Sequence, residues 1–247
     1  MDEAKSKILM LVEGSKTDYK LMQHLLDVYG IGENHEIVSY NTNIYVLYNE
    51  MFRDGDPESI DILQSLKEHE RDERRKMLFD QKYSDILLVF DLDPQDPNFS
   101  AEKILEMVSY FVESSDMGKL YLNYPMVEAF YHMKSIPDDE YNSYAVSMAE
   151  LKAHSYKMRV TRENRDHDYR KFAASREECT TVIKQNIEKA FSITNEQPKT
   201  DNIGEKIPRA EEILESQLDL IKREDRLSVL CTCAFYVADF NYKLLND

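Results

Sequence analysis

The chain has 247 residues, of which 42% are hydrophobic and 32% charged, and its formal net charge is −16 at pH 7. This length suits one large domain or a domain with an appendage. The acidic balance argues against a protein that coats nucleic acid nonspecifically, and no apolar run approaches the roughly 20 residues of a membrane-spanning helix. Three cysteines cannot all pair internally, which predicts buried or inert thiols in a reducing cytoplasm.

The first half of the chain predicts strands that alternate with helices. Short aliphatic and β-branched runs predict buried strands at residues 7–12, 36–40, 85–90 and 119–122. Helical periodicity predicts helices at residues 16–29, 44–52 and 100–114, with Ser100 as the N-cap of the last, and the start of another at 126–133. Residues 59–78 predict either a helix pair or one long helix. We therefore expect an α/β fold in which helices flank a parallel sheet.

The second half of the chain predicts mostly helices. After Pro137 strand signals fade, and helices are expected at about 147–155, 176–191, 207–222 and 226–245. The predicted organisation is an α/β domain over residues 1–135, with a helical insertion at about 53–80, followed by a helical C-terminal region over residues 136–247.

Acidic residues follow two of the predicted strands directly. Glu13 comes after the first strand, and Asp91 and Asp93 come after the strand at 85–90. The carboxyl ends of parallel strands line the ligand crevice of an open sheet, so these side chains should converge. Three crowded carboxylates repel one another unless a cation neutralises them, and an oxygen-only set of ligands suits Mg²⁺ or Mn²⁺.

A basic segment interrupts this acidic chain. Residues 152–176 hold eight basic residues against three acidic ones. Two interpretations remain open: a localised phosphate-binding surface, or an exposed charged loop.

The two acidic motifs resemble those of the TOPRIM domain, which topoisomerases, primases and several nucleases share. The residues that carry this resemblance are Val12-Glu13-Gly14-Ser15-Lys16-Thr17-Asp18 and Asp91-Leu92-Asp93. The form of the first motif is most similar to small nucleases of anti-phage and abortive-infection systems, the OLD-like (overcoming-lysogenization-defect) and RloB-like branch. Asn123-Tyr124-Pro125-Met126-Val127-Glu128 resembles a third motif of that branch. The resemblance covers roughly the first 135 residues and implies a TOPRIM-like sheet.

The resemblance implies roles for five carboxylates. Glu13 would be a metal ligand or a base, and Asp91 and Asp93 would be metal ligands. Asp18 would reach the metal through water, or would only favour the start of its helix. Glu128 would be an additional catalytic ligand, or a first-turn acid that stabilises its own helix.

Phosphate contacts are expected around the first motif and in the basic segment. Gly14 lets the backbone turn sharply, and Lys16 adds a positive charge at a helix N-terminus that suits phosphate. The resemblance implies that Lys171 stabilises the pentavalent phosphate, with Arg170 as a phosphate contact beside it. The alternative for Lys171 is an ordinary surface lysine.

The function expected from the resemblance is Mg²⁺- or Mn²⁺-dependent hydrolysis of RNA, possibly tRNA, or of DNA. Such a nuclease would act as a toxic effector of anti-phage defence in the cytoplasm, as a homodimer restrained or positioned by an ATPase partner. One alternative is a catalytically silent, TOPRIM-like interaction subunit. Another is a phosphatase of the haloacid-dehalogenase kind. The sequence fits that family less well, because the Asp-x-Asp motif lies in the middle of the chain and Gln95 stands two residues after it.

Overall fold

The computed structural model describes residues 7–52, 57, 60–115, 117–198 and 204–246. Its centre is a four-stranded parallel sheet in the order β2-β1-β3-β4. The strands are β1 (Ile8–Val12), β2 (His35–Ser39), β3 (Asp85–Asp91) and β4 (Lys119–Asn123). All four coincide with predicted strands to within about one residue, which confirms an α/β fold with a parallel sheet.

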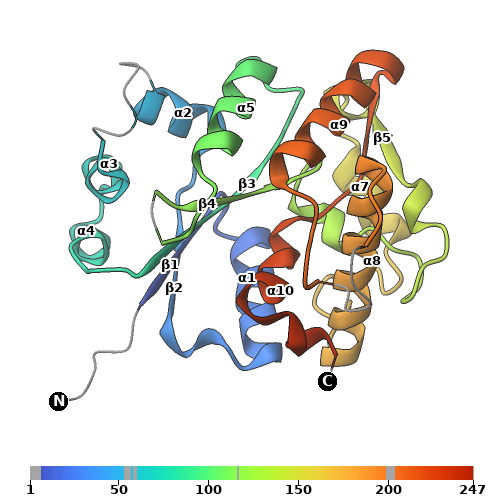
Figure 1. Ribbon diagram of the computed structural model, residues 1–247, viewed down its shortest axis with the longest axis horizontal. Helices are drawn as coiled ribbons and strands as arrows, with labels where there is room; N and C mark the ends of the chain where they lie inside the picture. The colour runs from blue at the N-terminus through green and yellow to red at the C-terminus, as the bar shows by residue number, and fades with distance from the viewer. Residues whose placement is uncertain (1–6, 53–56, 58–59, 116, 199–203, 247) are drawn as a thin grey trace.

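Helices cover both faces of this sheet. Helix α1 (Thr17–Tyr29) lies on one side, whereas α2 (Ile44–Phe52) and α5 (Ala101–Tyr110) lie on the other (Figure 1). The predicted N-cap of α5 is confirmed, because the Ser100 side chain accepts a hydrogen bond from the Lys103 N–H.

The charged segment between β2 and β3 forms a helix pair, α3 (Ile62–His69) and α4 (Glu73–Phe79). Asp72 is the N-cap of α4, since its side chain accepts a hydrogen bond from the Arg74 N–H. A new helix therefore starts after Asp72 instead of α3 continuing. Of the predicted insertion at 53–80, residues 53–56 and 58–59 lie outside the described residues.

The second half contains five α-helices within its described residues. They are α6 (Met148–Lys152), α7 (Tyr156–Glu163), α8 (Arg176–Thr194), α9 (Ala210–Glu224) and α10 (Tyr236–Asn241). Short 3₁₀ helices occur at η1 (Gly32–Asn34), η3 (Val127–Tyr131), η4 (Tyr141–Ser143), η5 (Cys233–Phe235) and η6 (Tyr242–Leu245). Helix α7 was not predicted, and the helix expected at 126–133 is instead the 3₁₀ helix η3.

The prediction of one helix over 226–245 is wrong. Residues Arg226–Ser228 form strand β6, which pairs antiparallel with β5 (Ala145–Ser147). Helix α9 ends where Asp225 adopts the left-handed conformation, with φ of 52°. The next residues, Val229 to Cys231, are fully buried. A buried strand and a buried helix both appear in a sequence as a run of apolar residues, so the run alone did not distinguish them.

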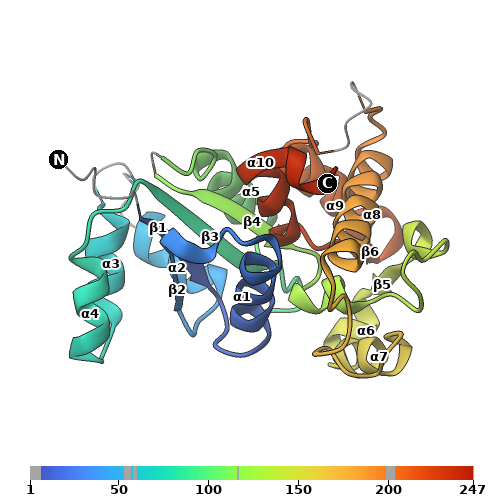
Figure 2. The same cartoon turned by 90° about the horizontal axis from the view of Figure 1, so that it is seen from below.

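The two halves share one hydrophobic core. Buried residues from both belong to a single cluster, and Tyr124 exchanges two backbone hydrogen bonds of 2.8 Å with Leu230. Figures 1 and 2 show α8 and α9 on one side of the molecule and α3 and α4 on the opposite side. The two halves therefore pack against each other through this core, and the division at residue 135 stays a prediction.

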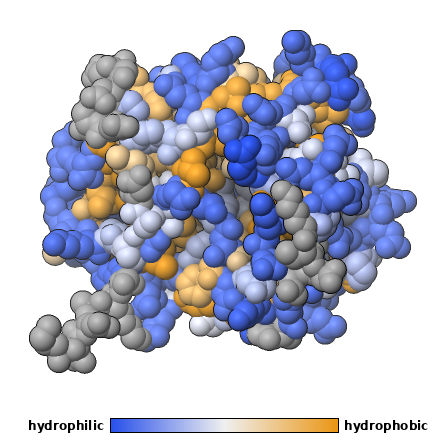
Figure 3. All heavy atoms as spheres, in the orientation of Figure 1, coloured by the Kyte–Doolittle hydropathy of each residue, from blue (hydrophilic) through white to orange (hydrophobic). Residues whose placement is uncertain are grey.

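The surface agrees with the composition. The face drawn in Figure 3 is mainly hydrophilic, with small apolar areas between charged side chains. Among the described residues, no helix is both long enough and apolar enough to cross a membrane.

Candidate metal centre

The candidate site lies where the chain direction across the sheet reverses. From β1 the chain crosses to β2, and from β3 it crosses to β4 on the opposite side, so β1 and β3 are neighbours whose connections diverge. Such a switch point leaves a crevice at the carboxyl ends of the two strands. Glu13 follows β1 directly and Asp91 is the last residue of β3.

The three predicted carboxylates meet there, as expected from their positions after the strands. Glu13, Asp91 and Asp93 each offer a carboxylate oxygen, and these oxygens lie within 4.8 Å of one another. Among the residues that the structure describes, no other group of three His, Cys, Asp or Glu side chains has this geometry.

Glu13 is held by backbone bonds on both sides. Its N–H donates to the Val89 carbonyl of the β3 side at 3.0 Å, and its carbonyl accepts from the Asn41 N–H beyond β2 at 2.8 Å. Its Oε2 accepts a hydrogen bond from the Asp91 N–H at 3.1 Å. These hydrogen bonds therefore orient the Glu13 side chain toward the carboxyl end of β3.

Asp91 is the most enclosed member of the trio, with 6% of its surface exposed. Its Oδ1 accepts hydrogen bonds from the Val127 N–H at 2.8 Å and from Asn123 Nδ2 at 3.3 Å. Asn123, which the β-ladder places opposite Asp91, is itself oriented because its Oδ1 accepts from the Cys233 N–H at 3.2 Å. Asn123 thus positions Asp91, a contribution that its place in the third motif did not reveal.

Asp93 sits on a turn with a left-handed backbone, with φ of 39°. Aspartate tolerates this region better than most residues. The turn is held by a 3.2 Å hydrogen bond from the Asp93 N–H to the Pro125 carbonyl, and the carboxylate accepts from Gln95 Nε2 at 3.0 Å. This turn brings the second aspartate of the motif back toward Glu13.

Two further carboxylates enclose the trio. Asp18, from the first turn of α1, is 7% exposed, and Glu128, from η3, is 3% exposed. Within the described residues, Asp18 Oδ1 and Glu128 Oε2 are buried without a hydrogen-bond partner. A Cβ at Gly14 would lie 2.6 Å from Asp18 Oδ2, so glycine is required at this position for Asp18 to approach as it does.

A lysine that the sequence did not single out completes the site. Lys157, in the first turn of α7, places its Nζ 3.1 Å from Glu128 Oε1. Its side chain is 62% exposed, whereas that of Glu128 is 4% exposed. The only sequence signal for Lys157 was its membership of the basic segment, because neither α7 nor its packing beside η3 was predicted.

Burial and mutual repulsion raise the pKa values of the clustered carboxylates. Burial raises the pKa of Glu13 to about 8, and the charges of Asp93 and Asp18 act in the same direction. The hydrogen bond from the Asp91 N–H opposes this increase. Burial and the neighbouring Glu128 charge raise the pKa of Asp18 to about 6. Burial is also the main cause that raises the pKa of Asp91 and of Asp93. A carboxylate with a pKa of about 8, such as that of Glu13, holds a proton at neutral pH, and a cation would compete with that proton.

The predicted phosphate contacts divide into two groups. Gly14 and Lys16 line an open depression of about 440 Å³ beside Glu13 and Asp18, which Lys157 also lines. Lys16 and Arg170 line an adjoining groove. Lys171 is exposed and lies near Asp168, and it lines neither of these two depressions.

Five basic residues of the segment 152–176 form ion pairs with acidic residues inside or outside it. Arg159 pairs with Glu150 and Glu163, and Arg165 pairs with Asp166 and Glu178. The segment is therefore largely a set of ion pairs. Lys157, paired with Glu128, and Arg170, paired with Asp168, are its basic residues that line the two depressions.

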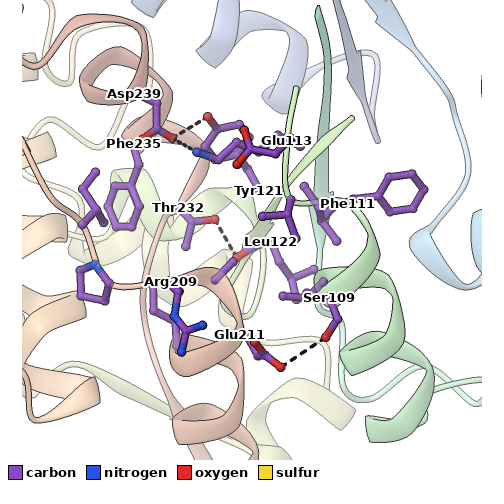
Figure 4. Close-up of a pocket in the computed structure, with 18 of the residues that line it drawn as sticks. Ser109, Phe111, Glu113, Tyr121, Leu122, Arg209, Glu211, Thr232, Phe235 and Asp239 are labelled. Atoms are coloured by element: carbon purple, nitrogen blue, oxygen red, sulfur yellow. Dashed lines mark hydrogen bonds and ion pairs between the residues drawn. The ribbon is translucent and has the colours of Figure 1, made fainter. Parts of the chain in front are cut away.

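A separate cavity of about 340 Å³ lies between β4, α5, α9 and the segment leading into α10. Figure 4 shows several of its polar groups paired with one another. Asp239 accepts hydrogen bonds from Lys119 and Tyr121, and the Thr232 hydroxyl donates to the Leu122 carbonyl. Among the described residues, this cavity has no group of converging carboxylates like the one at the ends of β1 and β3.

In comparisons with protein-family models, with curated proteins and with solved structures, nothing matches this chain.

Proposed function

We propose that the chain is a divalent-metal-dependent nuclease of the TOPRIM type. The observation that carries this proposal is the meeting of Glu13, Asp91 and Asp93 oxygens within 4.8 Å at the switch point of a parallel sheet. The order of the motifs along the sequence, which resembles that of TOPRIM nucleases, supports the same conclusion.

The residues present fit a hard divalent cation. The donor set consists of carboxylate oxygens, which Mg²⁺ and Mn²⁺ prefer. Buried oxygens of Asp18 and Glu128 that lack a partner among the described residues add acceptors beside the trio. In this proposal Glu13, Asp91 and Asp93 hold the metal, and Asp18 and Glu128 complete its surroundings.

The chemistry proposed is hydrolysis of a phosphodiester. A bound divalent cation supplies an activated water and neutralises charge on the phosphate. Lys157 brings a second positive charge to the same cluster through its ion pair with Glu128. We assign to Lys157 the phosphate-stabilising role that the resemblance suggested for Lys171, because Lys157 is the one that lines the depression beside Glu13.

The test is incubation of the chain with tRNA, single-stranded DNA and plasmid DNA in Mg²⁺ or Mn²⁺, with EDTA as the metal-free arm. We expect metal-dependent cleavage of at least one substrate. Glu13→Gln and Asp91→Asn should each lower the rate by at least about 100-fold, because each removes a ligand charge from the cluster.

Asp27→Asn is the matched control, since Asp27 is an exposed acid at the far end of α1 from Asp18. Full cleavage by both site variants, or equal cleavage in EDTA, would overturn the proposal. Circular dichroism of each variant separates lost chemistry from lost folding.

The biological setting proposed is anti-phage defence, with the nuclease as toxic effector, assembled as a homodimer and controlled by an ATPase partner. The alternative is a catalytically silent interaction subunit. It predicts that no nucleic acid is cleaved in any metal, while the chain still co-elutes with an ATPase encoded beside it.

A further inference from the structure

A groove of about 300 Å³ adjoins the carboxylate cluster. Helix α1 forms one wall, and η3 together with the loop after α7 forms the other. Lys16 and Thr17 line both this groove and the depression beside Glu13. The groove is therefore a direct continuation of the candidate active site.

The charge of the groove is opposite to that of the whole chain. Lys16, Lys20 and Arg170 line it, and no acidic side chain among the described residues does. Arg170 also pairs with Asp168 at 2.9 Å, so the two lysines carry most of the unpaired charge. Lys16 and Lys20 are exposed and are four residues apart, so they lie on the same face of α1 and near its first turn. On a chain of net charge −16, such a strip attracts phosphates locally without making the protein a general nucleic-acid binder.

An aromatic platform forms the opposite wall. The rings of Tyr131 and Tyr169 stack with centroids 4.1 Å apart and planes 8° apart. Tyr131 is 6% exposed and contacts Phe130 and Phe172 edge-on, so the core holds it in place. Tyr169 is half-buried and lines the groove. Stacked aromatic rings of this kind bind unpaired bases, because every base has a π-face.

We propose that this groove binds an unpaired, single-stranded stretch of nucleic acid next to the scissile phosphate. Lys16, Lys20 and Arg170 contact its backbone, and Tyr169, supported by Tyr131, stacks a base. The inference rests on the proposed function for the identity of the neighbouring site, and it narrows the substrate class to RNA or DNA with unpaired nucleotides. A duplex cannot offer a base to the platform without unstacking it first.

Binding rather than cleavage tests this proposal, so that it can fail independently of the nuclease assignment. Fluorescence anisotropy would measure binding of labelled U₁₂, dT₁₂ and a 12-base-pair duplex to the full chain in EDTA, over a range of salt concentrations. We expect both single strands to bind at least about tenfold more tightly than the duplex.

Variants assign that binding to the groove. Tyr169→Ala should weaken single-strand binding on the order of tenfold, and Tyr169→Phe should retain it because the ring remains. Lys20→Ala should reduce the slope of log K against log salt concentration by about 0.7, the contribution of one phosphate contact in a single strand. Lys222→Ala, an exposed lysine of α9, should change neither quantity.

Two results would overturn the proposal. One is duplex binding as tight as single-strand binding. The other is wild-type affinity and salt slope in both Tyr169→Ala and Lys20→Ala. Lys20 is exposed, so its variant remains informative even where Tyr169→Ala disturbs folding. Single-strand binding without any metal-dependent cleavage would support the groove and reject the nuclease.

Discussion

At the scale of single residues, the site depends on side chains that are held close together against their own repulsion. Glu13 and Asp91 are fixed by β-ladder bonds, and Asp18 reaches the cluster because Gly14 has no side chain. The raised pKa of Glu13, to about 8, results mainly from burial. The fold therefore holds acidic groups close together despite their mutual repulsion. This arrangement is typical of functional sites.

Gly14→Ala tests this packing. The new Cβ would lie 2.6 Å from Asp18 Oδ2, so the carboxylate must move away from the cluster. We expect a change in unfolding free energy of less than about 1 kcal/mol, with Mn²⁺ affinity, measured by titration calorimetry, weakened about 10- to 100-fold. Gly32→Ala is the control, because its Cβ would meet its nearest neighbour at an ordinary 3.4 Å. Unchanged affinity in Gly14→Ala would show that Asp18 plays no part in metal binding.

At the scale of elements, the small sheet β5–β6 is attached to α9 by one buried amide. Gln217 Nε2 donates to the Ser228 carbonyl at 2.9 Å, and Gln217 Oε1 accepts from the Ser228 N–H at 2.8 Å. Gln217 is fully buried. The side chain thus satisfies both backbone groups of a strand residue that has no third strand beside it in the described sheet.

Gln217→Ala should therefore destabilise the protein by about 2–4 kcal/mol, because it leaves a buried N–H and a buried carbonyl without partners. Denaturant unfolding followed by circular dichroism measures this difference. Gln64→Ala, at an exposed position of α3, should cost less than about 0.5 kcal/mol. Equal effects of the two substitutions would contradict the role assigned to Gln217.

At the scale of the whole molecule, a buried lysine links the helices of the second half. Lys189 of α8 is fully buried. Its Nζ donates to the carbonyls of Tyr141 at 2.7 Å and Tyr144 at 2.8 Å, and lies over the Tyr141 ring. Burial lowers the pKa of Lys189 to about 7, against the opposing effect of Asp138.

This lysine makes global stability depend on pH. Between pH 7 and pH 9 the unfolded chain retains a proton at Lys189 that the folded chain has released, so the unfolding free energy rises with pH. The rise is at most about 1.4 kcal/mol per pH unit. Denaturant unfolding of Lys189→Met should lose this increment, whereas Lys184→Met, on the same helix, should keep it. Parallel pH profiles of wild type and Lys189→Met would contradict the assignment.

How far the sequence predicts the fold follows from the range of the interactions involved. Strands β1 and β3 and helices α1 and α5 follow from local patterns of apolar residues and caps, which each segment carries within itself. The prediction of a helix over residues 226–245 was wrong because an apolar run carries no information about which segment it will pair with. Its pairing with β5 and with Tyr124 joins residues about 80 to 105 positions apart.

The sequence by itself determined the parallel α/β half and the meeting of Glu13, Asp91 and Asp93, because residues directly after parallel strands must share one edge of the sheet. Only the tertiary structure decided that Lys157, rather than Lys171, pairs with Glu128 beside those carboxylates, and that Asn123 orients Asp91. It also decided that Tyr131 and Tyr169 stack beside Lys16. The physical reason is that these contacts arise from packing between separate elements, which no local pattern encodes.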